Sequence, residues 1–211
     1  PVIWKVKSWP GGVSSRPVLS ASGDILYFGS ENGELAAVRT SDGSRLWTYL
    51  ARGFLQSSPT LSPDGGRLYV GSNGWQLHAV NTTDGSRIWV FDADGVIRGS
   101  PALDARHGRV YVGSWLGTFY AINTTDGSVL WTHYTKSYTE KAIQLSAAVT
   151  PDGLRVLVGC DNGFLYAFNA STGDELWKKK VAGSFRQSSP VLSPSGEVAY
   201  VAPGAALTAL N

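Results

Sequence analysis

One unit recurs five times along the chain, and this repetition constrains its fold more than any other feature. A Ser-Pro pair, or a relative of it, opens each unit. The second residues of these pairs are Pro17, Pro59, Pro101, Ala148 and Pro190, which gives successive separations of 42, 42, 47 and 42 residues. A fixed period of about 20 to 50 residues is the signature of repeat architectures. We therefore expect five copies of one supersecondary unit.

Three further landmarks follow in the same order within each unit. An apolar segment ends in Gly and a small residue, a segment with Ala as its third residue comes next, and a turn then leads to a Trp. The Gly residues are Gly29, Gly71, Gly113 and Gly159, with a weaker fifth copy at 198–202; the Ala residues are Ala37, Ala79, Ala121, Ala167 and Ala209; the Trp residues are Trp47, Trp89, Trp131 and Trp177, with one more at Trp4. Short segments rich in Val, Tyr, Leu and Trp, separated by Asp-Gly and Asn-Gly turns, are typical of antiparallel strands.

Each unit therefore contains four strands, which we name a to d in chain order. Four strands in about 42 residues match one blade of a β-propeller. We expect an all-β fold of four-stranded antiparallel blades at about 14–50, 56–92, 98–134, 146–180 and 187–211 plus 1–8, within a single domain over 1–211. The chain starts inside a strand d, Val2 to Lys7, and stops after a strand c, so the N-terminal strand is expected to complete the fifth blade and close the ring. A fragment of a propeller with seven or eight blades has the same ends and stays open as the alternative.

The clearest copy of the unit carries a family resemblance. It runs from Tyr111-Val112-Gly113-Ser114 through Tyr120-Ala121-Ile122-Asn123 to Trp131. This pattern resembles the repeat of PQQ-like propellers, the quinoprotein alcohol dehydrogenase-like family, along all 211 residues. The resemblance implies that the Trp of each blade docks against the neighbouring blade, which gives structural roles to Trp4, Trp47, Trp89, Trp131 and Trp177. It implies little about activity, since one fold serves many functions.

Composition excludes several classes of function. The formal net charge is only +2, and the longest run of like charges is the triplet at 178–180, so neither nucleic acid nor an anionic membrane is an expected partner. No apolar stretch approaches the roughly 18 residues of a membrane helix. We expect a soluble protein, and both a secreted or periplasmic and a cytoplasmic location stay open. The lone Cys160 excludes an internal disulfide and a thiol-based metal site.

The sequence offers no catalytic set, and it favours a non-enzymatic role. The three histidines, His78, His107 and His133, occupy different repeat positions, so we expect them to be separate surface groups rather than metal ligands. No cofactor is expected; PQQ and calcium belong only to the dehydrogenase alternative. That alternative is weakened by the single cysteine and five blades, since the resemblance implies about eight blades and often a cysteine pair in the enzymes. Three glycosylation sequons, at Asn81, Asn123 and Asn169, share one repeat position, and we interpret them as turn residues with glycosylation left open.

The candidate binding residues lie where the copies differ, because loops on a rigid scaffold carry function. In a propeller the b-to-c and d-to-next-a loops emerge on one face, around the central channel. The connection from Trp131 to Ala148 spans 17 residues against 12 or 13 elsewhere and contains Tyr138. Polar residues recur just before strand a, and two extra indoles lie in the b-to-c loops. The candidates are Arg16, Gln56, Trp75, Arg98, Trp115, Tyr138, Gln144, Asp161 and Arg186.

Guanidinium and amide donors with two indoles suit an acidic peptide or an anionic or planar ligand. Long side chains that only fill the solvated channel mouth are the competing interpretation. The preferred hypothesis is a scaffold that binds a protein partner on this face. A small-ligand-sensing domain of a larger protein and a fragment of a PQQ-dependent dehydrogenase are the alternatives. The oligomeric state and the identity of any partner are not readable from the sequence.

Overall fold

The computed structural model describes residues 2–6, 9, 11–135, 142–181, 183–186, 188–204 and 206–211. The chain divides into two compact units, Pro1–Pro101 and Ala102–Asn211. Within the described ranges the secondary structure is almost entirely short strands, with a single 3₁₀ turn. The expectation that all residues form one domain stays a prediction.

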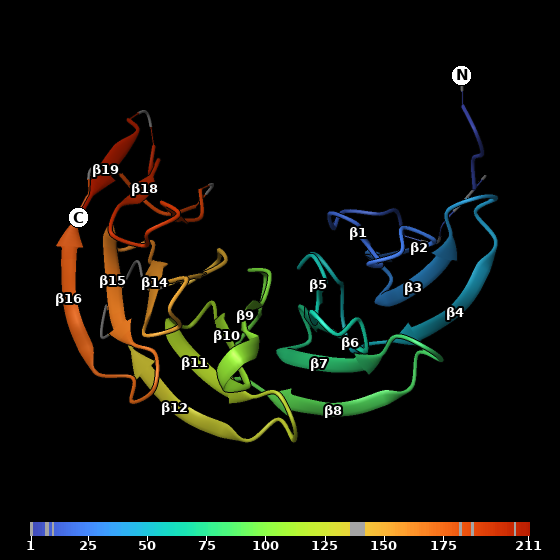
Figure 1. Ribbon diagram of the computed structural model, residues 1–211, viewed down its shortest axis with the longest axis horizontal. Helices are drawn as coiled ribbons and strands as arrows, with labels where there is room; N and C mark the ends of the chain where they lie inside the picture. Colours follow the sequence, from blue (N-terminus) through green and yellow to red (C-terminus); the bar gives the residue numbers. More distant parts are fainter. Residues whose placement is uncertain are drawn as a thin grey trace. The chain divides into compact units, whose positions relative to one another are not determined.

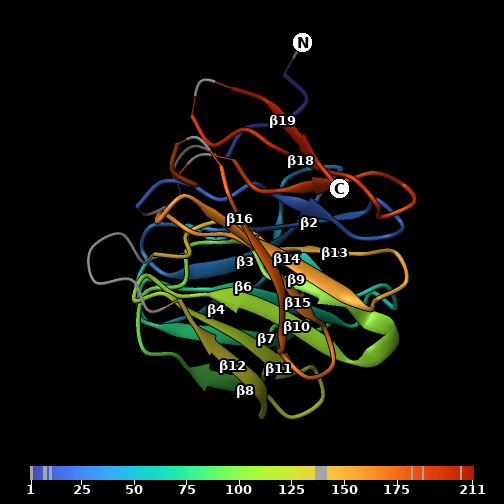
Figure 2. The same cartoon turned by 90° about the vertical axis from the view of Figure 1, so that its left-hand side faces the viewer.

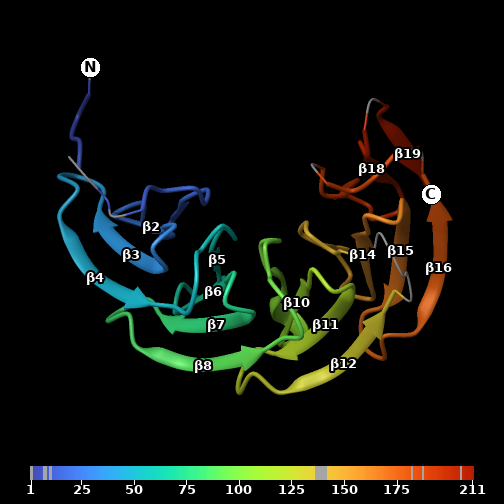
Figure 3. The ribbon, with the colours of Figure 1, turned by 180° about the vertical axis from the view of Figure 1, so that it is seen from behind.

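The first unit contains two four-stranded antiparallel sheets, ordered β1-β2-β3-β4 and β5-β6-β7-β8. Figures 1 and 3 show the strands of each sheet lying side by side in chain order. The strands are β1 (Val18–Leu19), β2 (Ile25–Gly29), β3 (Glu34–Arg39), β4 (Arg45–Leu50), β5 (Thr60–Leu61), β6 (Arg67–Gly71), β7 (Gln76–Asn81) and β8 (Arg87–Asp92). Each sheet corresponds to one predicted blade.

The second unit contains two four-stranded sheets and a sheet of three strands. Figure 2 shows β14, β15 and β16 of the second of these sheets next to one another. The elements are β9 (Ala102–Asp104), η1 (Ala105–His107), β10 (Arg109–Gly113), β11 (Thr118–Asn123), β12 (Val129–Tyr134), β13 (Ala148–Val149), β14 (Arg155–Gly159), β15 (Phe164–Asn169), β16 (Glu175–Lys180), β17 (Val191–Leu192), β18 (Ala199–Val201) and β19 (Thr208–Leu210).

These sheets confirm the predicted all-β fold of antiparallel blades, with one correction. Residues 2–6, expected to be a strand d, form no strand, and the fifth sheet ends at β19. A strand needs a hydrogen-bonded neighbour. The N-terminal segment is instead attached to its own unit by the side chain of Trp4, whose Nε1 donates to the carbonyl oxygen of Thr40 at 2.6 Å. Closure of the ring by this segment stays a prediction.

The core lies around strands b and c. In β6 and β7, for example, four consecutive residues are buried, which is the pattern of strands covered on both faces. Strands d are half-exposed and pair each Trp with the Ala of strand c, as in Ala37↔Trp47 and Ala121↔Trp131. A register shift follows each of these Ala residues, so the small side chain and the bulge occur together opposite the indole.

Indole rings lie against a glycine turn in the adjacent blade. Trp47 Nε1 donates to the carbonyl oxygen of Thr82 at 2.8 Å, and a Cβ added to Gly85 would lie 2.6 Å from the Trp47 ring. Trp131 repeats the arrangement with the carbonyl of Ala170, at 3.0 Å, and with Gly173. The indole N–H thus has the partner that a buried Trp requires. The energetic weight of this docking stays a prediction.

Two glycines with nearly equal φ values test how much the docking of Trp47 contributes to the free energy of unfolding. Gly85 and Gly65 have φ values of 73° and 72°, but no atom lies within 4 Å of a Cβ on Gly65. We expect Gly65→Ala to cost about 1 kcal/mol, because only the left-handed backbone penalises it. Gly85→Ala should cost about 2 kcal/mol more, because its methyl group also collides with the Trp47 ring. Urea denaturation of both variants measures the difference.

Equal losses of stability in the two variants would contradict docking of Trp47 on this turn. Adding Gly85→Ala to Trp47→Ala separates the two contributions. Relative to Trp47→Ala alone, the second change should cost only the backbone penalty, because the ring is already absent.

His78 is buried, so the prediction that it lies on the surface is wrong. It is 2% exposed on β7, where Ala36, Tyr120 and Tyr166 stand in other repeats. Its Nδ1 lies 2.9 Å from the hydroxyl of Tyr49 on the adjacent blade. Burial lowers the pKa of His78 from 6.5 to about 4; Asp92 opposes this shift and Arg87 adds to it, both to a smaller extent. Neighbouring side chains across two blades cause this burial, which a single repeat does not reveal.

Stability should therefore fall as the pH drops from about 6.5 to about 4. In this window the unfolded chain binds a proton at His78 and the folded chain does not, which favours unfolding by up to about 3 kcal/mol. His78→Gln keeps a hydrogen-bonding side chain and cannot titrate, so its stability should change less over the same range. Parallel pH profiles for the two proteins, measured by urea denaturation, would contradict the burial of a neutral His78.

The three sequon asparagines form turns. The Oδ1 atoms of Asn81, Asn123 and Asn169 each accept a hydrogen bond at 2.8 Å from the backbone N–H two residues later. This is the Asx-turn geometry, and it accounts for their shared repeat position. Their glycosylation stays untested.

Candidate functional site

We define the loop face of each unit as the ends of its blades from which the b-to-c and d-to-a loops emerge. A recurrent contact holds these loops. An apolar residue of the d-to-a loop lies against the Gly that ends strand b, so that a Cβ on this Gly would collide with it. The pairs are Gly29 with Leu55, Gly71 with Ile97, Gly113 with Ile143 and Gly159 with Phe185. All four apolar residues are fully buried, so each loop has a fixed anchor next to its polar residue.

In the second unit, three predicted site residues come together. Asp161, in the loop between β14 and β15, is 5% exposed. Its Oδ2 accepts a hydrogen bond from Gln144 Nε2 at 2.5 Å and lies 3.6 Å from Arg186 Nε. The Arg186 side chain remains 60% exposed. The carboxylate therefore orients two side chains from two d-to-a loops, one of them a cation accessible to a partner.

In the first unit, Gln56 is part of a similar but uncharged contact. Its Oε1 accepts from Asn73 Nδ2 at 3.3 Å, and residues 56 and 73 have the same spacing as residues 144 and 161. Arg98 is half-buried and Arg16 is exposed. The backbone N–H of Arg16 donates to Ser58 Oγ at 2.9 Å. The sequence interpretation missed Asn73; the shared spacing was the signal that could have found it.

Both extra tryptophans are exposed, Trp75 by 55% and Trp115 by 40%. Phe54, 52% exposed in the d-to-a loop that precedes β5, was not among the predicted residues. Tyr138 lies outside the described residues. The binding roles of the predicted set stay predictions, whereas the described members of the set lie on loops.

Neither an activated thiol nor a cluster of metal ligands occurs among the described residues. Burial raises the pKa of the Cys160 thiol, which disfavours the nucleophilic thiolate. Among the described residues, no three His, Cys, Asp or Glu side chains gather as metal ligands. His107 is held by Asp104, at 2.9 Å from its Nδ1, away from the loop face. The described helical residues include no helix that is long and apolar enough to cross a membrane.

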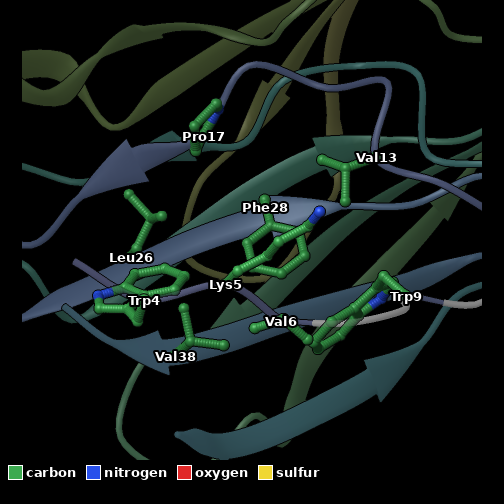
Figure 4. A pocket seen from close by; sticks show the side chains of 9 residues that line it. All are labelled: Trp4, Lys5, Val6, Trp9, Val13, Pro17, Leu26, Phe28 and Val38. Atoms are coloured by element: carbon green, nitrogen blue, oxygen red, sulfur yellow. The ribbon is translucent and has the colours of Figure 1, made fainter. Parts of the chain in front are cut away.

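The first unit also contains an apolar cavity of about 360 Å³. Figure 4 shows Trp4 and Trp9 from the N-terminal segment facing Leu26 and Phe28 of β2 and Val38 of β3. Trp9 packs edge-on against Phe28 at 4.8 Å between ring centroids, and the Arg45 guanidinium lies 4.1 Å from the centre of the Trp9 ring. The lining is almost entirely apolar, with Lys5 as its one charged residue, so we do not place the functional site there.

Comparison with known families agrees with the repeat and the sheets. The family model described as outer membrane protein assembly factor BamB matches residues 1–64 and 55–211. A search of curated proteins gave no match. The two matched segments together cover the chain, and their PQQ-like repeat is the one that the sheets display. The chain therefore belongs to the PQQ-like repeat family described as outer membrane protein assembly factor BamB.

Proposed function

We propose that this protein is a non-enzymatic scaffold that binds a protein partner on its loop face. The observation that carries the proposal is the arrangement of Arg186, Asp161 and Gln144. A buried carboxylate fixes an exposed guanidinium on a loop that is itself anchored by a buried aromatic residue. A pre-oriented Arg is among the residues that contribute most to protein interfaces, because little side-chain entropy is lost on binding.

The loop face offers further contact area of the same kind. Trp115 is 40% exposed and its neighbour Leu116 is 43% exposed. Aromatic and Arg side chains are enriched in interface centres, whereas Lys and Glu are depleted. The family description names an outer membrane protein assembly factor, which supports a role in contacting other proteins. Because the Arg186 guanidinium is exposed, a partner with acidic side chains opposite it would match its charge.

The two alternatives keep the status of hypotheses. A small-ligand sensor would use the same loops for an anionic or aromatic molecule, and a dehydrogenase fragment would need PQQ and calcium. Calcium requires six to eight oxygen ligands, and the described residues present no cluster of acidic groups of that kind. The scaffold function proposed above requires neither group.

Site-specific photo-crosslinking tests the scaffold proposal. A photoreactive amino acid at Leu116 lies on the loop face, and one at the 63% exposed Leu154 lies in the turn between β13 and β14, at the other end of its blade. In cells that express the protein, position 116 should give a discrete crosslinked partner, and position 154 should not. Arg186→Glu should reduce the product at least tenfold, since reversing an oriented charge costs more than about 1.4 kcal/mol.

The matched control is Arg106→Glu, a charge reversal at an exposed residue of η1, which should leave the product unchanged. The scaffold proposal is wrong if both crosslinking positions give the same products, or if Arg186→Glu and Arg106→Glu behave alike while both variants remain folded by circular dichroism.

A further inference from the structure

Trp75 has an unusual backbone conformation. Its φ is 68°, and among the residues that the structure describes it is the only non-glycine with a positive φ. The same repeat position is occupied by Gly33, Gly117 and Gly163, with φ between 80° and 88°. The backbone role is unchanged, because the N–H of each residue donates to the carbonyl three positions earlier; for Trp75 this is Ser72, at 3.3 Å. The blade formed by β5 to β8 thus has an indole where three other blades have no side chain.

This substitution has a steric cost and no evident structural benefit. A bulky residue in the left-handed region is disfavoured by contact of its Cβ with the backbone. Burial does not offset this cost, because the Trp75 side chain is 55% exposed. A strained residue that persists on the surface indicates a functional constraint rather than packing.

The surroundings of Trp75 define the chemistry of the surface. The loop that contains it crosses the loop of residues 51–59, where the carbonyl of Phe54 accepts the N–H of Asn73 at 2.9 Å. Phe54 is itself 52% exposed. On the other side, Trp75 accepts the N–H of Ala93 at 2.8 Å. The preceding residue, Asp92, is exposed, and its carboxylate is held by the Nε2 of Gln76 at 2.7 Å. Trp75 and Asp92 therefore lie on adjacent chain segments joined by the Ala93 hydrogen bond, and an uncharged amide positions the Asp92 carboxylate.

We propose that this surface, defined by Trp75, Phe54 and Asp92, binds an Arg or Lys side chain in an extended segment of a partner protein. An indole is the best aromatic acceptor for a cation, and a nearby carboxylate adds direct charge attraction. An acidic segment would be repelled by Asp92. The inference rests on the proposed scaffold function and assigns to the first unit a partner chemistry opposite to that expected at Arg186.

Four residues at position 75 separate backbone strain from recognition. Trp75→Gly relieves the strain and removes the indole, and we expect it to raise the Tm by about 3 °C. Trp75→Ala keeps the strain and removes the indole, so its Tm should stay near that of the parent or below it. Trp75→Phe keeps both the strain and a weaker aromatic face. Leu154→Ala, at an exposed apolar residue in the second unit, is the control for loss of exposed apolar area.

Binding is measured with a short peptide of alternating Gly and Arg and with its Gly-Gln counterpart, by following the indole N–H signals in ¹⁵N spectra. The Arg peptide should shift the Trp75 signal saturably, and the shift should weaken with added salt. Trp75→Gly, Trp75→Ala and Asp92→Asn should lose most of the binding, whereas Trp75→Phe should retain part of it.

An equal response to the Gln peptide, or no response of Trp75 to the Arg peptide, would overturn the inference. A Tm lowered by Trp75→Gly would instead indicate a structural role for the indole. Either result leaves the crosslinking through Leu116 and Arg186 unaffected, so failure here is distinguishable from failure of the scaffold proposal.

Discussion

The loop face depends on one steric relation, the insertion of an apolar side chain into the space that a strand-ending glycine leaves open. Leu55, Ile97, Ile143 and Phe185 each lie where a Cβ on the facing Gly would collide with them. In three of the four cases the backbone N–H of the inserted residue also donates to the carbonyl oxygen of the residue after that Gly. Ile97, for example, donates to Ser72 at 3.2 Å. The contact is fully buried, and it fixes a loop that no strand pairing holds.

Side chains next to these anchors inherit fixed positions. Gln144 and Arg186 each follow an anchor residue directly, and both reach Asp161. Gln56 follows Leu55 and reaches Asn73. A repeated anchor thus lets the adjacent residue vary between copies without loss of geometry. This arrangement suits a recognition surface, because the scaffold absorbs the ordering cost before a partner binds.

The fold was predictable because its determinants are local and repeated. One repeat already shows the glycines in the turns, the Ala opposite the Trp and the apolar runs of strands b and c. The sheets follow these features. Contacts between units of the repeat were not predictable in the same way. His78 is buried because Tyr49 of the adjacent blade covers it, and Asp161 acquires two partners from loops 17 residues before and 25 residues after it. The strand expected at residues 2–6 was wrong because strand formation requires a neighbour that sequence alone does not place. The strained backbone of Trp75 was detectable by aligning the copies, since three of the other four have Gly at this position.

A double-mutant cycle at Gly71 and Ile97 tests the anchoring contact most directly. Ile97→Ala alone should be strongly destabilising, because it empties a fully buried site, by about 2 to 5 kcal/mol. Gly71→Ala alone should also destabilise, since its Cβ collides with Ile97. If the two side chains share one space, Ile97→Ala should cost at least about 1 kcal/mol less in the Gly71→Ala background, as measured by urea denaturation. Additive losses, within about 0.5 kcal/mol, would show that the glycine does not make room for the anchor and would contradict this account of the loop face.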